Sequence, residues 1–185
     1  YYFPEPLAPL IAARKAYRRI YLSAVLRTIR AAQEGCDCLL VEGAGGVLVP
    51  IAKDLMLADL IAALKCEVLL VARDKIGTLN HTFLSIEALR HRSVRSIKVI
   101  LVGQARPDMS SRDNGRCIAK TIENIDVFSI GYFKRVARNS LTKVGCAKKI
   151  KKTLARIMRP DNFTAVVRTA AKAAKRKTGK RKINR

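Results

Sequence analysis

The residues best suited to chemistry lie in one short segment, VEGAGG, at positions 41–46. It follows an apolar run at 36–41 that is broken only by Asp37 and that predicts a buried strand. A carboxylate just after such a strand lies where open α/β sheets bind ligands. Glu42 could therefore hold Mg²⁺, and the glycines would let the backbone approach a phosphate. The alternative is a tight turn with Glu42 in solvent.

A second candidate is the segment GTLNHT, at positions 77–82, which follows another apolar run at 68–72. The segment opens a predicted helix, whose first N–H groups are unpaired and whose dipole is positive at that end. An anion could bind there. Alternatively, Thr78 or Asn80 serves only as a helix cap.

Cysteine and histidine residues give weaker signals. Cys36 and Cys38 would point to one face of a strand, but no second pair follows at zinc-site spacing, so simple packing is favoured. His81 and His91 lie ten positions apart, a poor spacing for joint metal ligation. The chain has 5 cysteines, several of them in apolar runs, which favours reduced thiols and a cytoplasmic location.

The elements that must position these residues follow from the hydropathy pattern. Strands that alternate with helices predict βαβ units and a parallel sheet covered on both faces. The pattern predicts one amphipathic helix within 11–34, strands at 36–41, 68–72, 97–103 and 127–133, and helices near 57–64, 80–92, 110–122 and 150–158.

Length and charge set the domain organisation. The chain has 185 residues, 49% of them hydrophobic, and we expect one α/β domain over 1–158. Its formal net charge is +23, of which +15 falls on residues 143–185. We expect the basic tail at 159–185 to be unable to bury enough apolar surface to fold alone. The tail could contact nucleic acid or another anionic partner, or could be a solvated terminus. No apolar run is long enough to predict a membrane span, and the first residues do not have the pattern that predicts a signal peptide.

Two longer strings carry a family resemblance. GCDCLLVEGAGGVLVPI and DLMLADLIAALKCEVLLVARDKIGTLNHTFLSIEALR, which begin at Gly35 and Asp54, closely resemble the dethiobiotin synthetase family of biotin synthesis. The likeness covers roughly residues 3–133. It implies a three-layer α/β fold of the P-loop NTPase type, a homodimer, and the ATP- and Mg²⁺-dependent closure of a cyclic urea from 7,8-diaminononanoate and CO₂.

The resemblance also assigns roles to residues of this chain. Glu42 would be the Mg²⁺-associated acid, and the nucleotide would lie near Glu42, Gly43, Ala44, Gly45, Gly46 and Val102. The helix start formed by Gly77, Thr78, Leu79 and Asn80 would receive the carboxylate of the substrate across the dimer interface. That role agrees with the helix-terminus argument above.

Several departures from the family pattern matter. The phosphate-binding GxxxxGK[ST] motif and the catalytic lysines of the family are absent from these residues, so we identify no catalytic residue here and expect the chain alone to be inactive. We therefore expect an incomplete amino terminus. Leu10 replaces a usual histidine, Val102 an adenine-contacting asparagine and Gly131 a proline.

These departures leave two alternatives open. One is a non-catalytic relative that kept the fold and uses its basic tail to bind nucleic acid or other anionic partners. The other is a related P-loop ligase that forms amides.

Overall fold

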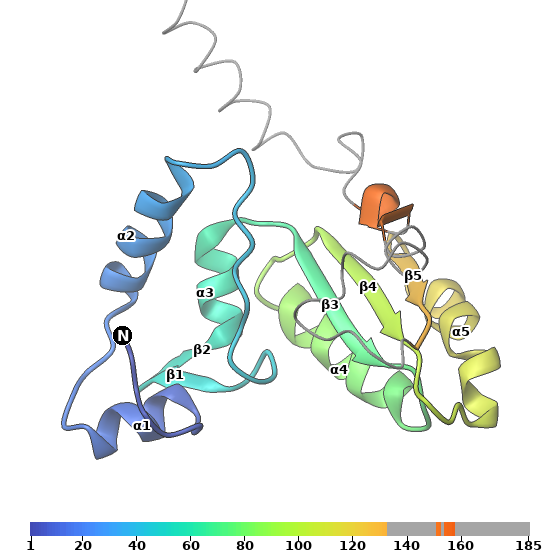
Figure 1. Ribbon diagram of the computed structural model, residues 1–185, viewed down its shortest axis with the longest axis horizontal. Coiled ribbons are helices and arrows are strands. Elements are labelled where there is room, and N and C mark those ends of the chain that lie inside the picture. The colour runs from blue at the N-terminus through green and yellow to red at the C-terminus, as the bar shows by residue number, and fades with distance from the viewer. Residues whose placement is uncertain (133–150, 153, 158–185) are drawn as a thin grey trace, which may run out of the picture. The chain divides into compact units, whose positions relative to one another are not determined.

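The computed structural model describes residues 1–132, 151–152 and 154–157 (Figure 1). The chain divides into two compact units. Unit 1 comprises residues 1–66 and 80–95, and unit 2 comprises residues 67–79 and 96–185. The tail expected at 159–185 lies outside the described residues. Among those described, no helix is long and apolar enough to cross a membrane.

Unit 1 combines short helices with a small antiparallel hairpin. Its elements in chain order are α1 (Pro9–Lys15), α2 (Leu22–Gln33), β1 (Pro50–Ala52), β2 (Leu55–Met56) and α3 (Leu57–Leu64). The predicted helix near 57–64 is confirmed as α3. The hairpin was not predicted, because strands of 3 and 2 residues are too short to show an alternating pattern.

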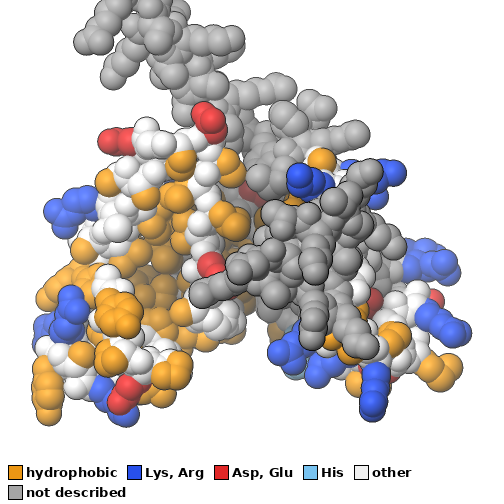
Figure 2. Space-filling model, viewed as in Figure 1, with side chains coloured by type: hydrophobic (Ala, Val, Ile, Leu, Met, Phe, Trp, Pro, Cys, Tyr) orange, Lys and Arg blue, Asp and Glu red, His pale blue; other side chains and the backbone are white. Residues whose placement is uncertain are grey.

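A small apolar core holds unit 1 together. Its buried members come from α1, the α1–α2 turn, β1 and α3, and they are Ala13, Ile20, Ile51 and Leu60. The apolar face of α2 packs against this core but contains no fully buried residue. In the space-filling view, hydrophobic side chains accordingly remain visible over the α1–α2 region (Figure 2).

The prediction of one helix over 11–34 is wrong, because the chain turns between α1 and α2. Tyr17 adopts a left-handed conformation with φ of 52°. The Arg18 N–H donates to the Ala13 carbonyl and the Tyr17 N–H to the Arg14 carbonyl, at 2.9 and 3.1 Å. These are the two hydrogen bonds of a Schellman motif, here formed without the usual glycine. The helix therefore ends at a turn that no Gly or Pro announces.

The prediction of a buried strand at 36–41 is also wrong. None of these residues is in a strand, and Leu40 is 79% exposed. A strand forms only where a neighbour satisfies its backbone N–H and C=O groups. No strand in the described part of the chain pairs with this segment.

Unit 2 is built on a three-stranded parallel sheet. Its strands are β3 (Val68–Arg73), β4 (Ile97–Val102) and β5 (Asp126–Ile130), in the order β3-β4-β5. The predicted strands at 68–72, 97–103 and 127–133 are thus confirmed to within a few residues. β4 lies in the middle and is buried over five of its six residues.

Helices cover both faces of this sheet, as predicted. On one face, α5 (Asn114–Thr121) approaches so closely that a Cβ on Gly115 would lie 3.5 Å from Leu101 Cδ1. On the other face lie the helical residues 151–152 and 154–157. One of them, Arg156, contacts β5, because its guanidinium carbon lies over the Phe128 ring, 5.9 Å from the ring centroid. Opposite faces are assigned because Leu101 and Phe128 occupy alternate positions of the sheet register.

The helices predicted near 110–122 and 80–92 are confirmed with shifted bounds. The first is a 3₁₀ turn, η1 (Met109–Arg112), followed by α5. The second is α4 (Thr78–Arg90), and the boundary between the two units falls within its first turn.

A buried ion pair lies beneath the residues at 151–157. Lys98 on β4 is 3% exposed, and its Nζ lies 2.8 Å from Glu67 Oε1. The same Nζ donates to the Ile157 carbonyl at 3.1 Å. Ser96 also donates to Glu67 Oε1. Because a buried charge is costly unless it is paired, this arrangement ties the backbone at Ile157 to the sheet.

Candidate nucleotide and substrate site

The loop that carries Glu42 lies in unit 1 and is irregular along its length. Glu42 itself is exposed. Two backbone hydrogen bonds attach the end of the loop to the start of α3: Leu57 N–H to the Val49 carbonyl at 3.0 Å, and Ala58 N–H to the Val47 carbonyl at 2.8 Å. The loop is therefore held by the backbone of α3 rather than by a preceding strand.

Two of the loop glycines lie close to neighbouring side chains, and one of them, Gly45, is also needed for its backbone conformation. A Cβ on Gly43 would lie 2.5 Å from Leu57 Cδ2, and one on Gly45 would lie 2.8 Å from Val49 Cγ2. Gly45 also has φ of 88°, where other residues are strained. Gly46 differs, because a Cβ there would meet nothing within 4 Å. Open space thus lies beside Gly46, while Gly43 and Gly45 permit close packing.

The single carboxylate of Glu42 fits a Mg²⁺ site that is completed by water and by the phosphates of a nucleotide. Among the described residues, no group of three or more His, Cys, Asp or Glu side chains could enclose an ion. Mg²⁺ is usually bound through one or two carboxylates, several waters and the phosphates of the substrate, rather than by an all-protein cage. A single exposed carboxylate beside a glycine loop suits an ion that arrives with a nucleotide.

The start of α4 has the backbone that an anion site needs. Gly77 adopts φ of 87° and allows the chain to turn from the loop at 74–77 into the helix. Thr78 is buried, and its N–H donates to the Lys75 carbonyl at 3.1 Å. Leu79 is half-buried and Asn80 is exposed. The helix has 13 residues, so its amino end carries a full dipole, and the amides of the first turn after Thr78 have no partner within the helix.

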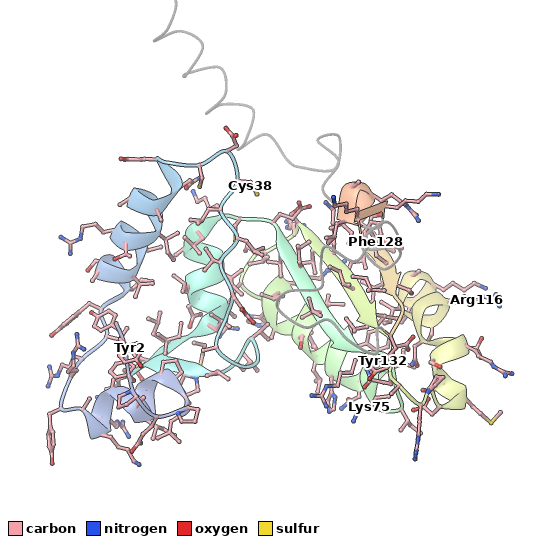
Figure 3. All side chains as sticks on the ribbon, viewed as in Figure 1. Tyr2, Cys38, Lys75, Arg116, Phe128 and Tyr132 are labelled. Carbon is pink, nitrogen blue, oxygen red and sulfur yellow. The ribbon has the colours of Figure 1, made fainter. Side chains whose placement is uncertain are left out.

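Val102 lies at the carboxyl end of the unit 2 sheet, where its carbonyl accepts hydrogen bonds from two neighbouring residues. This carbonyl accepts the Asp74 N–H and the Gln104 side-chain amide, each at 2.8 Å. Next to it, a Cβ on Gly103 would lie 3.0 Å from the Tyr132 amide nitrogen. Figure 3 shows Tyr132 and Lys75 at this same end of the sheet. The strand ends therefore meet with little room between their backbones.

Sequence reasoning missed a polar network at this end of the sheet. Asp108 accepts the Ile76 N–H at 2.7 Å, across 32 positions of the sequence. Asn114, which is buried, donates to Asp74 Oδ1 at 2.8 Å and to Ser110 Oγ at 3.2 Å. The short string PDMSS, in which an Asp precedes two serines, was the only signal, and it is typical of a helix cap rather than of a distant contact.

The network also affects the acidity of one carboxyl group. Hydrogen bonds from the Ser110 side chain and the Ile76 amide hold the pKa of Asp108 below its ordinary value. Asp108 is therefore an anion at neutral pH.

The structure brings some of the predicted residues together within one unit. Val102 and the segment Gly77, Thr78 and Leu79 lie in unit 2, connected through the loop that begins at Asp74. Residues 42–46 belong to unit 1. Asn80 follows Leu79 in the first turn of α4, at the boundary between the two units.

Comparison with known proteins identifies the family. The model of a family described as "AAA domain" matches residues 1–137. The chain belongs to this family. That assignment agrees with the α/β fold of the P-loop NTPase type and with the parallel sheet of unit 2.

Curated relatives narrow the resemblance. The chain is 45% identical over 101 residues to the ATP-dependent dethiobiotin synthetase of Anaeromyxobacter sp. (strain Fw109-5), a match that covers 55% of this chain and 45% of the relative. It is 43% identical over 121 residues to the enzyme of that name from Mycolicibacterium vanbaalenii, covering 64% and 54%. It is 35% identical over 113 residues to the enzyme of that name from Bacillus licheniformis, a match that covers 60% of this chain and 48% of the relative. The chain spans about half the length of these relatives.

Proposed function

We propose that this chain is part of an ATP-dependent dethiobiotin synthetase. The carrying observation is its membership of the family whose model spans residues 1–137, together with its similarity to relatives that bear that name. The matched range includes both the Glu42 loop and the start of α4.

The proposed reaction closes a cyclic urea from 7,8-diaminononanoate and CO₂. One amine of the diamine adds to CO₂ and loses a proton, which gives a carbamate. A carbamate oxygen then takes the terminal phosphoryl group of ATP, and ADP leaves. The second amine attacks the carbamate carbon, the C–O bond to phosphate breaks, and the urea forms with release of inorganic phosphate.

In this proposal the Glu42 loop serves the nucleotide. Glu42 holds Mg²⁺ directly or through water, and Gly43, Ala44, Gly45 and Gly46 lie near the phosphates. Mg²⁺, when bound, neutralises charge on the phosphates. The exposure of Glu42 and the open space beside Gly46 support this role, because a ligand can reach both.

The start of α4 binds the other substrate. Gly77, Thr78, Leu79 and Asn80 receive the carboxylate of 7,8-diaminononanoate from across a homodimer interface. The unpaired amides and positive dipole of this helix end favour an anion. Val102 lies near the nucleotide in this proposal. Because its side chain is apolar and its carbonyl already accepts the Asp74 N–H and the Gln104 side-chain amide, it would offer the base an apolar contact rather than a hydrogen bond.

The proposed location is the cytoplasm. The described cysteines, Cys36, Cys38, Cys66 and Cys117, are all free thiols, and three of them are exposed. Exposed thiols persist in reducing compartments, where ATP is also supplied.

The experiment that tests the proposal uses Glu42→Gln in the full-length gene product. This substitution keeps the size of the side chain but removes its charge. We expect product formation at limiting Mg²⁺ to fall by about tenfold or more, since one carboxylate ligand is lost. The matched control is Glu34→Gln, which changes an exposed carboxylate just after α2 and should leave the rate unaltered. Full activity of Glu42→Gln would remove the metal role from this residue. A wild type that converts other acids or amines but not the diamine would indicate a related ligase.

A further inference from the structure

We propose that Asp108 and Asn114 are positioning residues, which hold the loop at 74–77 so that the amino end of α4 can receive the substrate's carboxylate. This inference rests on the proposed function, because it concerns the same helix end. All of the contacts that carry it lie within unit 2.

Asp108 and Asn114 together form what we call the clamp on the loop at 74–77, and Asp108 makes the first set of its contacts. Its Oδ2 accepts the Ile76 N–H at 2.7 Å, and its Oδ1 accepts both the N–H and the hydroxyl of Ser110. The carboxylate thus caps η1 and at the same time grips the residue just before Gly77. Hydrogen bonds to an ionised acceptor are about twice as strong as neutral ones, so this contact restrains the loop firmly.

Asn114 makes the second set of contacts in the clamp. It is 3% exposed, and its side-chain amide donates to Asp74 Oδ1 at 2.8 Å and to Ser110 Oγ at 3.2 Å. A weaker contact reaches the Lys75 carbonyl at 3.5 Å. A buried amide whose donors are all directed at one loop and its capping turn fixes the relative position of the two.

The network is continuous from the strand end to the helix start. The Asp74 N–H donates to the Val102 carbonyl, so the first residue of the loop is also fixed to β4. Asn114 and Asp108 then hold the middle and the end of the same loop. The loop is therefore attached at three successive points before Gly77. Gly77, with its positive φ, then turns the chain into α4.

The clamp also decides which amides remain for a ligand. Because Asp108 takes the Ile76 N–H, an incoming carboxylate must bind to the amides of the first helical turn, beyond Ile76. Both oxygens of the anionic Asp108 accept hydrogen bonds from Ile76 and Ser110, which lowers but does not remove its repulsion of that ligand.

The test combines hydrogen exchange with kinetics on the full-length gene product. The variants are Asp108→Ala and Asn114→Ala, with Asp108→Asn as a conservative variant that keeps one acceptor oxygen. The matched control is Asp113→Asn, because Asp113 is an adjacent exposed acid whose side chain forms no capping hydrogen bond. Exchange of the amides at 74–79 is measured by mass spectrometry, and KM is measured separately for 7,8-diaminononanoate and for ATP.

We expect Asp108→Ala to speed exchange at 74–79 by about tenfold and the control to leave it unchanged. We expect the KM for the diamine to rise by about tenfold and the KM for ATP to stay within about twofold, since only the carboxylate site is displaced. Asp108→Asn keeps one acceptor oxygen but loses the second oxygen and the charge, so it should give intermediate values of both the exchange rate and the KM for the diamine. If Asn114→Ala does not fold, Asp108→Ala and Asp108→Asn still decide the outcome, because Asp108 is at the surface.

Two results would overturn the inference while leaving the proposed function intact. One is unchanged exchange in Asp108→Ala. The other is faster exchange with an unchanged KM for the diamine, which would make the network merely structural. A wild type that forms no product from the diamine is distinguishable from both, because it refutes the proposed function and removes the substrate role with it.

Discussion

Two octapeptides of this chain share a sequence pattern but not a structure. CDCLLVEG at 36–43 and CEVLLVAR at 66–73 agree at a cysteine, two leucines and a valine. Residues 68–73 of the second form β3, paired along its length with β4. The first is irregular, and its Leu40 is largely exposed while the equivalent Leu70 is half-buried.

The difference teaches that an apolar run is only a candidate for a strand. Its backbone groups must be satisfied by a neighbour, and that neighbour is set by the rest of the fold rather than by the run itself. In unit 2, β4 supplies the neighbour for β3. Unit 1 relies instead on a small core between α1, α3 and the hairpin.

The largest effect is expected from the buried charge of unit 2. Lys98→Ala should lower the free energy of unfolding by about 3–5 kcal/mol, because it leaves the Glu67 carboxylate buried without its cation. Urea denaturation provides the measurement. Lys120→Ala, on the exposed side of α5, is the matched control and should change stability by less than about 0.5 kcal/mol. A loss from Lys98→Ala as small as that of the control would show that the pair does not hold the sheet.

Truncation of one leucine in each unit sharpens the comparison directly. Leu101→Ala on β4, where the side chain is 1% exposed, should cost about 2–5 kcal/mol of unfolding free energy. Leu40→Ala should cost less than about 0.5 kcal/mol, because that side chain is already in solvent. Both values come from the same denaturation curves. Equal losses would mean that residues 36–41 are packed as tightly as a central strand.

The glycine loop offers a test within unit 1. Gly45→Ala should destabilise the chain by about 1–3 kcal/mol, because it places a side chain at positive φ and against Val49. Gly46→Ala is the matched control. A Cβ at Gly46 meets nothing within 4 Å, so this variant should be nearly neutral. Thermal unfolding of the two variants distinguishes them. Equal sensitivity would show that Gly45 has no special conformational role.

The smallest effect concerns acid. The side-chain hydrogen bond from Arg92, helped by the Met56 amide, holds the pKa of Asp59 below its ordinary value of 3.8. The ionised form is therefore favoured in the folded state, so its contribution to stability is present above about pH 4 and is lost as the pH falls through the lower folded value. Asp59→Asn should flatten the loss of stability between about pH 4 and pH 2. Urea midpoints across this range provide the check, with the exposed Asp37→Asn as control. An unaltered pH profile for Asp59→Asn would count against the Arg92 contact.

The sequence predicted best what local patterns determine. β3, β4 and α3 are continuous apolar or amphipathic segments bounded by polar residues or glycine, and their positions were predicted to within a residue or two. The break between α1 and α2 was not, because Tyr17 forms the left-handed turn that glycine usually marks. The prediction of a strand at 36–41 was wrong for a non-local reason, because a strand forms only where a partner strand pairs with it.

The candidate site shows the same limit. The start of a helix at GTLNHT was predicted from the sequence, and the structure adds the positive φ of Gly77. The contact between Asp108 and Ile76 could not, because it joins segments 32 positions apart. Nor could the sequence say that Gly43 and Gly45 pack against Leu57 and Val49. Long-range contacts decide how a motif is held, and a motif does not contain them.

The central claim is that this chain serves an ATP-dependent cyclisation of a diamine, and one measurement tests it most directly. The full-length gene product is incubated with 7,8-diaminononanoate, ATP, Mg²⁺ and isotope-labelled bicarbonate, and the products are followed by mass spectrometry. We expect a cyclic urea that carries the label, formed together with equal amounts of ADP and inorganic phosphate. ATP hydrolysis without labelled urea, or no conversion of the diamine, would contradict the claim.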